Sequence, residues 1–267
     1  MKSLYFAELD AFIRYHNIPG KGKILVFLPG LSMPSLEQFL GVVTHPDIAG
    51  YQSLLIDYIG SGYSDHSPRF EYSIENHARS VAAVLDNEGI NCCTVIGHSM
   101  GGTVGIMLSR IRPDLVAKLV VAEANLSPGG GEATRRIASY TESDYVNEGH
   151  QTILAELRKA ELQGDQKAAF IYAAWSRAFP SGLYKSSVAL VDLDETFKEL
   201  FKELSIPRTF IYGEKSIPKD RCTSRPDAPD PYELAEFDIQ ITTIPNAGHA
   251  MMFDNLEGFV EVLTKVV

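Results

Sequence analysis

Six short runs rich in apolar residues recur along the chain, and each is closed by a proline, a glycine or an acidic residue. A run that is apolar at every position is typical of a strand buried on both faces, as in a parallel sheet. Helical patterns separate several of these runs, and this alternation predicts a parallel sheet with right-handed crossovers. The predicted strands are Ile24–Leu28, Ser53–Ile56, Cys93–Ile96, Leu119–Ala122, Thr209–Tyr212 and Ile239–Ile244.

Two strands at the N-terminus complete the predicted sheet. Leu4–Leu9 and Ala11–Tyr15 flank Asp10 and predict an antiparallel hairpin. The predicted fold class is therefore α/β, with a mostly parallel eight-stranded sheet flanked by helices. The helices with the clearest patterns are Ile74–Asn87, Met100–Ile111 and Leu256–Val267.

The alternation stops between about residues 126 and 205, where helical patterns occur without a convincing strand. We interpret this stretch as a helical cap (lid) that is inserted over one end of the sheet and is mobile. The core then consists of residues 1–125 and 206–267. Inside the cap the predicted helices are Gln151–Gln163, Asp165–Phe179 and Phe197–Leu204, and the later proline-rich stretch Pro218–Pro231 is predicted to be a loop.

The chain carries 24 basic and 34 acidic residues, which gives a net charge of −10. A protein this acidic has no bulk attraction to nucleic acid or to anionic membranes, so neither is an expected partner. Its 45% apolar and 22% charged residues are ordinary for a globular protein, and no apolar run approaches the ~20 residues of a membrane span. None of these features indicates an oligomeric state.

The cysteines Cys92, Cys93 and Cys222 have no spacing typical of a zinc site or a disulfide framework. Because the N-terminus also lacks the apolar core of a signal peptide, we expect reduced thiols in a cytoplasmic protein. No cofactor is predicted, since Gly60 and Gly62 lack the third glycine of a dinucleotide-binding motif. No metal site is predicted either. Five histidines without cluster spacing are interpreted as surface or locally hydrogen-bonded residues: His16, His45, His66, His77 and His150.

Gly97-His-Ser-Met-Gly101 matches the pattern G-x-S-x-G where an apolar strand ends and a helix begins. A tight turn at such a junction strains the serine backbone, and the two glycines leave room for neighbouring segments. Ser99 would then lie at the carboxyl edge of the sheet and at a helix N-terminus, which favours developing negative charge. Ser99 is thus the candidate nucleophile, with a plain glycine–serine turn as the alternative. His98 is interpreted as a structural residue of this turn.

A serine hydroxyl needs a neighbouring base before it becomes a nucleophile. His249 follows the last predicted strand and precedes the last predicted helix. In a parallel sheet the loop between them lies at the same edge as Ser99. His249 is therefore the candidate base, and a solvated loop histidine is the alternative.

Four motifs in order resemble those of the α/β-hydrolase fold family. Gly97–Gly102 is similar to the family's nucleophile turn, and Asp57–Asp65 resembles its loop after the fourth strand. Leu28–Leu31 and Gly248–His249 stand where the family has its His-Gly loop and its catalytic histidine. The resemblance covers the predicted core and implies a hydrolase of this fold.

The resemblance also implies two backbone donors for an oxyanion hole, the N–H groups of Leu31 and Met100. Pro29 stands where the family commonly has histidine. Proline has no N–H group to donate. Because the implied donor is the N–H of Leu31, the proline at position 29 does not remove a donor from the oxyanion hole.

The third member of the triad departs from the common pattern, because Gly213-Glu-Lys-Ser216 has serine where many members have aspartate. Glu123 closes the strand after the nucleophile's helix, so we expect its carboxylate at the same edge of the sheet. The order Ser99, Glu123, His249 keeps the family's nucleophile–acid–base sequence. Glu123 is the preferred acid, Glu214 and Asp220 are alternatives, and a capping role in the loop is the other interpretation of Glu123.

These residues predict a serine hydrolase that cleaves a small to medium apolar carboxylic ester through an acyl-enzyme. The same triad can act on a lactone, thioester, amide or carbon–carbon bond, and a non-catalytic small-ligand-binding protein of the same fold is the alternative from another class. The cap is expected to set the choice of this small-molecule substrate. Trp175 lies in an apolar helical stripe that is interpreted mainly as packing, and it is the candidate substrate contact in the cap.

Overall fold

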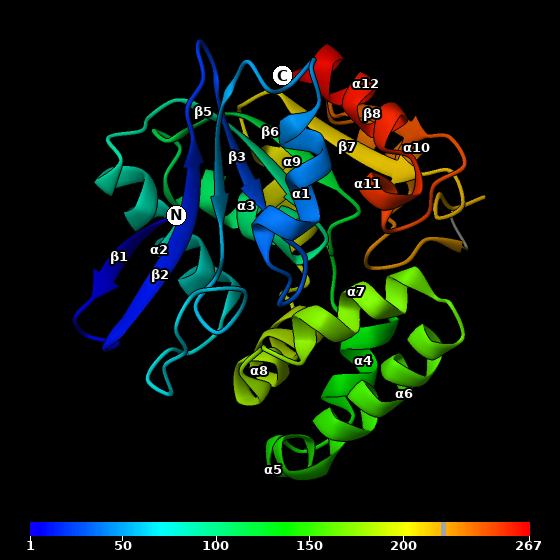
Figure 1. Cartoon of the computed structure of the whole chain (residues 1–267). Helices are drawn as coiled ribbons and strands as arrows, with labels where there is room; N and C mark the ends of the chain where they lie inside the picture. The colour runs from blue at the N-terminus through cyan, green and yellow to red at the C-terminus, as the bar shows by residue number, and fades with distance from the viewer. Residues whose placement is uncertain (220–222) are drawn as a thin grey trace.

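The computed structural model describes residues 1–219 and 223–267, and its centre is one mixed sheet (Figure 1). The strand order is β1-β2-β4-β3-β5-β6-β7-β8. β1 and β2 pair antiparallel, β2 pairs antiparallel with β4, and all the other pairs are parallel. This confirms the predicted eight-stranded, mostly parallel sheet. The strands are β1 Lys2–Phe6, β2 Ala11–Ile18, β3 Ile24–Leu28, β4 Gln52–Ile56, β5 Cys93–His98, β6 Val116–Ala122, β7 Arg208–Gly213 and β8 Gln240–Ile244.

The N-terminal hairpin differs from the prediction at one end. β1 ends at Phe6 rather than at Leu9, because the chain turns there and the Leu9 N–H bonds to the Phe6 carbonyl at 3.1 Å. Asp10 completes the turn with a positive φ of 49°. A four-residue turn needs these positions, so they are not available for pairing with β2.

The strand order creates a switch point beside β3. β4 pairs with β3 on one side, and the chain then crosses over so that β5 pairs with β3 on the other side. Ligands of open α/β sheets bind outside the carboxyl ends of the strands at such a point. The register places Leu28 opposite Gly97, and His98 opposite Ala122. The segments after β3, β5 and β6 therefore start side by side.

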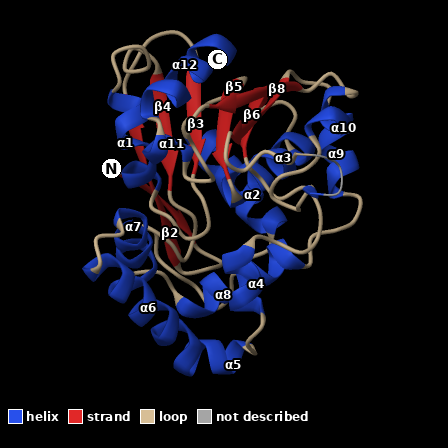
Figure 2. Ribbon diagram, turned by 90° about the vertical axis from the view of Figure 1, so that its right-hand side faces the viewer, coloured by secondary structure: helices blue, strands red, loops and turns tan. Residues whose placement is uncertain are grey.

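Helices cover both faces of the sheet (Figure 2). On one face, α1 Ser35–Thr44, α11 Met251–Asp254 and α12 Leu256–Val266 contribute to one apolar cluster with β3 and β4. On the other face, α2 Ile74–Asn87 and α3 Met100–Ile111 contribute to the second cluster. The patterns of α2, α3 and α12 were predicted. α1 was not, because Ser35 and Gln38 are polar residues on its buried face and interrupt the apolar stripe.

Residues 132–191, here called the helical segment, contain helices and no strand. Figures 1 and 2 show them gathered beyond one end of the sheet. The later α9 (Phe197–Glu203) contacts α3 of the sheet layers, and α10 spans Pro231–Ala235. The division into a core and a mobile cap stays a prediction. The helical segment consists of α4 Glu132–Ala138, α5 Glu142–Asp144, the π-helical turn η1 Tyr145–Gly149, α6 His150–Leu162, α7 Gln166–Trp175 and α8 Pro180–Val191.

Gly101 allows α3 to approach β3 closely. A Cβ atom at Gly101 would lie 2.1 Å from the Leu28 carbonyl oxygen, far inside van der Waals contact. Gly50, in contrast, has no atom within 4 Å of an added Cβ. Overpacking typically costs about 1–3 kcal/mol, so we expect Gly101→Ala to lower the Tm by roughly 2–12 °C.

Thermal unfolding followed by circular dichroism measures this effect, with Gly50→Ala as the matched control. An equal Tm for the two variants would contradict the close approach.

Candidate functional site

Ser99 lies in a strained turn between β5 and α3. Its φ is 54° and its ψ is −125°, a conformation that costs a residue with a side chain about 1–3 kcal/mol. Two backbone hydrogen bonds hold the turn: the Ser99 N–H donates to the Ala122 carbonyl at 2.8 Å, and the Gly102 N–H donates to the Ser99 carbonyl at 2.9 Å. The half-buried serine therefore stands at the N-terminus of α3, at the carboxyl edge of the sheet.

Glu123 and His249 come together although 126 positions separate them. The Glu123 Oε2 lies 2.8 Å from the His249 Nδ1, and its Oε1 accepts a hydrogen bond from the Gly213 N–H at 2.7 Å. A carboxylate only accepts hydrogen bonds, so the Nδ1 of His249 carries the proton and the Nε2 is left to interact with a neighbouring group. Glu123 is 1% exposed, whereas the His249 side chain is 45% exposed.

The other acid candidates differ in their surroundings. Glu214 accepts a hydrogen bond from the backbone N–H of Asn246 at 2.6 Å, so it supports the loop that leads to His249. The Ser216 N–H closes the preceding turn on the Gly213 carbonyl. Asp220, like Cys222, lies outside the residues that the structure describes. Among the described candidates, Glu123 is the carboxylate that contacts the imidazole.

Gln38 and His98 link the loop after β3 to His249. The Gln38 Oε1 accepts from the Gly30 N–H at 3.0 Å, and its Nε2 donates to the His98 Nδ1 at 2.9 Å. The remaining ring nitrogen, Nε2, then carries a proton and donates to the His249 carbonyl at 2.7 Å. Burial, followed by the neighbouring His249, lowers the pKa of His98 to about 3. His98 is therefore a neutral link, and Gln38 had no motif by which the sequence could reveal it.

The N–H groups of Leu31 and Met100, the two implied oxyanion donors, belong to the loop after β3 and to the start of α3. Leu31 follows Gly30, which Gln38 holds, and Met100 is the first residue of α3. Within the described parts of the chain neither N–H has a hydrogen-bond partner. An added Cβ at Gly30 would lie 3.7 Å from the Ser99 Cβ, so the loop passes directly beside the serine.

Trp175 connects the helical segment to the same loop. Its indole N–H donates to the Leu31 carbonyl at 3.1 Å, and the residue is buried. The structure thus gives the polar atom of Trp175 a protein partner. The predicted substrate contact of Trp175 stays a prediction.

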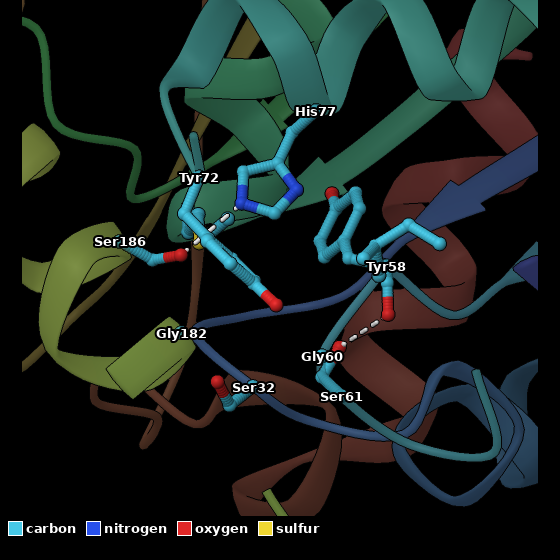
Figure 3. Close-up of a pocket in the computed structure, with 10 residues that line it drawn as sticks. Ser32, Tyr58, Gly60, Ser61, Tyr72, His77, Gly182 and Ser186 are labelled. Atoms are coloured by element: carbon cyan, nitrogen blue, oxygen red, sulfur yellow. Dashed lines mark hydrogen bonds between the residues drawn. The ribbon is translucent and has the colours of Figure 1, made fainter. Parts of the chain in front are cut away.

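A narrow pocket lies between the sheet edge and α8 (Figure 3). It is the part of the site that the sequence did not indicate, since its residues come from five separate segments and share no single motif. His77 was expected at the surface or in a local hydrogen bond, but it is buried in this pocket and pairs with the distant Ser186. His150 is buried and makes a local hydrogen bond, as expected, with Tyr145 at 3.1 Å. The lining residues are Ser32, Tyr58, Ile59, Gly60, Ser61, Tyr72, His77, Met100, Gly182 and Ser186.

Among the described residues, no group of three or more His, Cys, Asp or Glu side chains could hold a metal ion. None of the described helices is long and apolar enough to cross a membrane.

Comparison with known proteins decides the family. The sequence profile of the alpha/beta hydrolase fold matches residues 23–182, more than half of the chain. The chain belongs to the alpha/beta hydrolase fold family. It is therefore related to hydrolases, as the order of its motifs indicated.

Named relatives span several hydrolase activities. The chain is 26% identical over 231 residues to the sn-1-specific diacylglycerol lipase ABHD11 of Mus musculus, covering 80% of this chain and 71% of the lipase. It is 25% identical over 264 residues to the N-formylmaleamate deformylase of Pseudomonas putida, covering 92% and 90%. A thermophilic esterase from Thermogutta terrifontis has a similar fold, with a TM-score of 0.78, 17% identity and coverage of 99% and 97%.

The low pKa of His98 predicts that its ring does not titrate between pH 5 and 8. In a long-range ¹H–¹⁵N spectrum we expect His98 to keep its proton on Nε2 throughout this range, because Gln38 occupies Nδ1 and burial disfavours the charged ring. The His98→Asn variant assigns the signal. A titration midpoint of His98 above pH 5 would contradict the neutral link.

Proposed function

We propose that the protein is a serine hydrolase that cleaves a small carboxylic ester through an acyl-enzyme, with Ser99 as nucleophile, His249 as base and Glu123 as acid. The observation that carries the proposal is the contact of the buried Glu123 carboxylate with His249, 2.8 Å long, at the sheet edge where Ser99 stands in its strained turn. This contact leaves the Nε2 of His249 available to accept the proton of a serine hydroxyl.

The first half of the proposed reaction forms the acyl-enzyme. The Ser99 Oγ attacks the ester carbonyl carbon while its proton passes to the His249 Nε2. The carbonyl oxygen becomes an oxyanion, and His249 then returns the proton to the leaving alcohol as the C–O bond breaks. Glu123 stays ionised and stabilises the positively charged imidazole. Its burial supports this role, because charges interact more strongly away from water.

In the second half a water molecule replaces the alcohol. His249 accepts a proton from this water, the hydroxide attacks the acyl carbon, and Ser99 leaves with the proton that His249 returns.

The unpaired N–H groups of Leu31 and Met100 are the proposed oxyanion hole. Donors that are held in place before the reaction need no reorganisation when the charge develops, and each is typically worth about 10²–10³ in rate. Gln38 supports this by holding the loop at Gly30, and Trp175 supports it by binding the Leu31 carbonyl.

A second candidate is the hydrolysis of an amide-type bond by the same residues. It is favoured by the similarity to a deformylase over 92% of the chain. The lipase and esterase relatives favour the ester. In both cases the partner is a small molecule, and the expected location is the cytoplasm.

We expect Ser99→Ala to abolish both the hydrolysis of p-nitrophenyl esters and labelling by a fluorophosphonate probe, because the attacking oxygen is gone. His249→Ala should be about as damaging, since the two residues act as a unit. Steady-state assays and gel fluorescence measure these losses, and circular dichroism checks the fold. If Ser99→Ala kept more than about a few per cent of the wild-type kcat, the assignment would be wrong.

Glu123→Gln removes the charge of the proposed acid with little change in shape. We expect kcat to fall by up to ~10⁴, the size of effect that loss of the acid's charge has in serine proteases with a Ser-His-Asp triad. Glu214→Gln is the matched control and should be mild, because Glu214 bonds to a backbone N–H rather than to the imidazole. Normal turnover in Glu123→Gln together with a collapse in Asp220→Asn would transfer the role to Asp220.

A further inference from the structure

Two buried polar atoms in the pocket of Figure 3 have no hydrogen-bond partner among the described residues, the Tyr58 hydroxyl and the His77 Nδ1. Both residues are 1% exposed. Folded proteins pair the large majority of their buried polar side-chain atoms, and an unpaired one lowers stability. Two such atoms in a single pocket therefore call for a functional explanation.

The two atoms belong to neighbouring rings. The centroids of Tyr58 and His77 are 5.0 Å apart, and Figure 3 shows the Tyr58 ring beside the imidazole. The other ring nitrogen of His77, Nε2, lies 3.1 Å from the Ser186 hydroxyl. The Ser186 hydroxyl can either donate to Nε2 or accept from it. A neutral imidazole carries one proton, so Nδ1 accepts when Nε2 donates to Ser186 and donates when Nε2 accepts from it. Tyr58 and His77 together thus offer at least one donor and one acceptor.

The pocket favours a neutral group. None of its described lining residues is Lys, Arg, Asp or Glu. Burial lowers the pKa of His77 to about 3, so the imidazole is uncharged near neutral pH. A carboxylate or an ammonium group would meet no opposite charge here, and moving a charge out of water without a partner is costly.

The pocket continues into the proposed oxyanion hole. Met100 follows Ser99, Ser32 follows Leu31, and both line the pocket. In the sheet, β4 and β8 lie on opposite sides of β5. His249, which follows β8, has to reach the leaving oxygen, so the alcohol part of an ester lies toward β8. We therefore place the acyl part on the opposite side, toward Tyr58, which follows β4.

The helical segment completes the pocket with α8. Gly182 lies so close to Tyr72 that an added Cβ would stand 2.6 Å from the Tyr72 ring, and Ser186 lies one turn further along the same face. The side chains leave no water-sized space between them. Binding of a group in this pocket therefore requires α8 to move away from the Tyr72 ring.

We propose that this pocket binds a neutral hydrogen-bonding group, a hydroxyl or a carbonyl, on the acyl part of the substrate. Tyr58 and His77 are its recognition residues. This inference rests on the proposed function. The sequence predicted an apolar acyl group, whereas the pocket favours an acyl group that carries one polar substituent.

Matched esters test the proposal. The substrates are p-nitrophenyl hexanoate and its 3-hydroxy and 5-oxo derivatives, compared by kcat/KM. We expect the wild-type enzyme to prefer at least one polar ester by about fivefold or more. Tyr58→Phe removes one recognition atom, and His77→Phe removes the other together with the hydrogen bond between its Nε2 and Ser186. In both variants the preference should fall to about one.

Tyr15→Phe is the matched control. Tyr15 is equally buried, but its hydroxyl bonds to Glu88 at 2.5 Å, away from the pocket. We expect this variant to keep the wild-type preference and to lower the Tm. Tyr58→Phe loses no protein hydrogen bond, so its Tm should stay the same or rise.

Suppose that the enzyme hydrolyses p-nitrophenyl hexanoate and that the fluorophosphonate labels Ser99. Two outcomes would then overturn the proposed role of the pocket while leaving the proposed function intact. One is a wild-type preference near one for every pair. The other is a lower Tm in Tyr58→Phe with an unchanged preference, which would show that Tyr58 and His77 pair with each other structurally. Absence of both labelling and hydrolysis would instead overturn the proposed function, and this inference with it.

Discussion

The site depends on the hydrogen bonds of one buried group, the carboxylate of Glu123. It accepts one hydrogen bond from the Gly213 N–H at the end of β7 and one from His249 after β8. A single side chain at the end of β6 therefore holds together segments that follow three adjacent strands. Because the group is buried and charged, loss of either partner leaves it poorly compensated, whereas both bonds together define its position. The orientation of His249, and with it the proposed reaction, follows from this contact.

Backbone strain is concentrated at the same edge of the sheet. Ser99 and Glu123 both have positive φ values, 54° and 44°, and they follow the neighbouring strands β5 and β6. Neither is glycine, so each conformation is unfavourable on its own and persists because the surroundings determine it. The N–H of Ser99 bonds to the Ala122 carbonyl, and the N–H of Glu123 bonds to the Ile211 carbonyl. The sheet thus continues one residue beyond each strand and fixes the two side chains relative to each other.

The helical segment contacts the sheet edge at two places outside the proposed triad. Trp175 binds the carbonyl of Leu31, in the loop that carries a proposed oxyanion donor, and Ser186 binds His77 in the neighbouring pocket. Motion of this segment would therefore alter both the proposed oxyanion hole and the proposed acyl pocket. In our proposal the contacts that select the substrate come from outside the triad, and one fold can in this way serve different activities.

Local patterns in the sequence were sufficient for the strands apart from the bounds of β1, for three of the flanking helices, and for placing Ser99, Glu123 and His249 at one edge of the sheet. Burial on both faces leaves a continuous apolar run, and in a parallel sheet the residue that closes each run must lie at one edge. The tertiary structure alone decided the rest: the helix α1 with its buried Gln38, the link from Gln38 through His98 to His249, and the pairing of His77 with Ser186. These contacts join residues that are 60, 151 and 109 positions apart. Their partners are selected by how the layers pack, and no period or spacing along the chain records that choice.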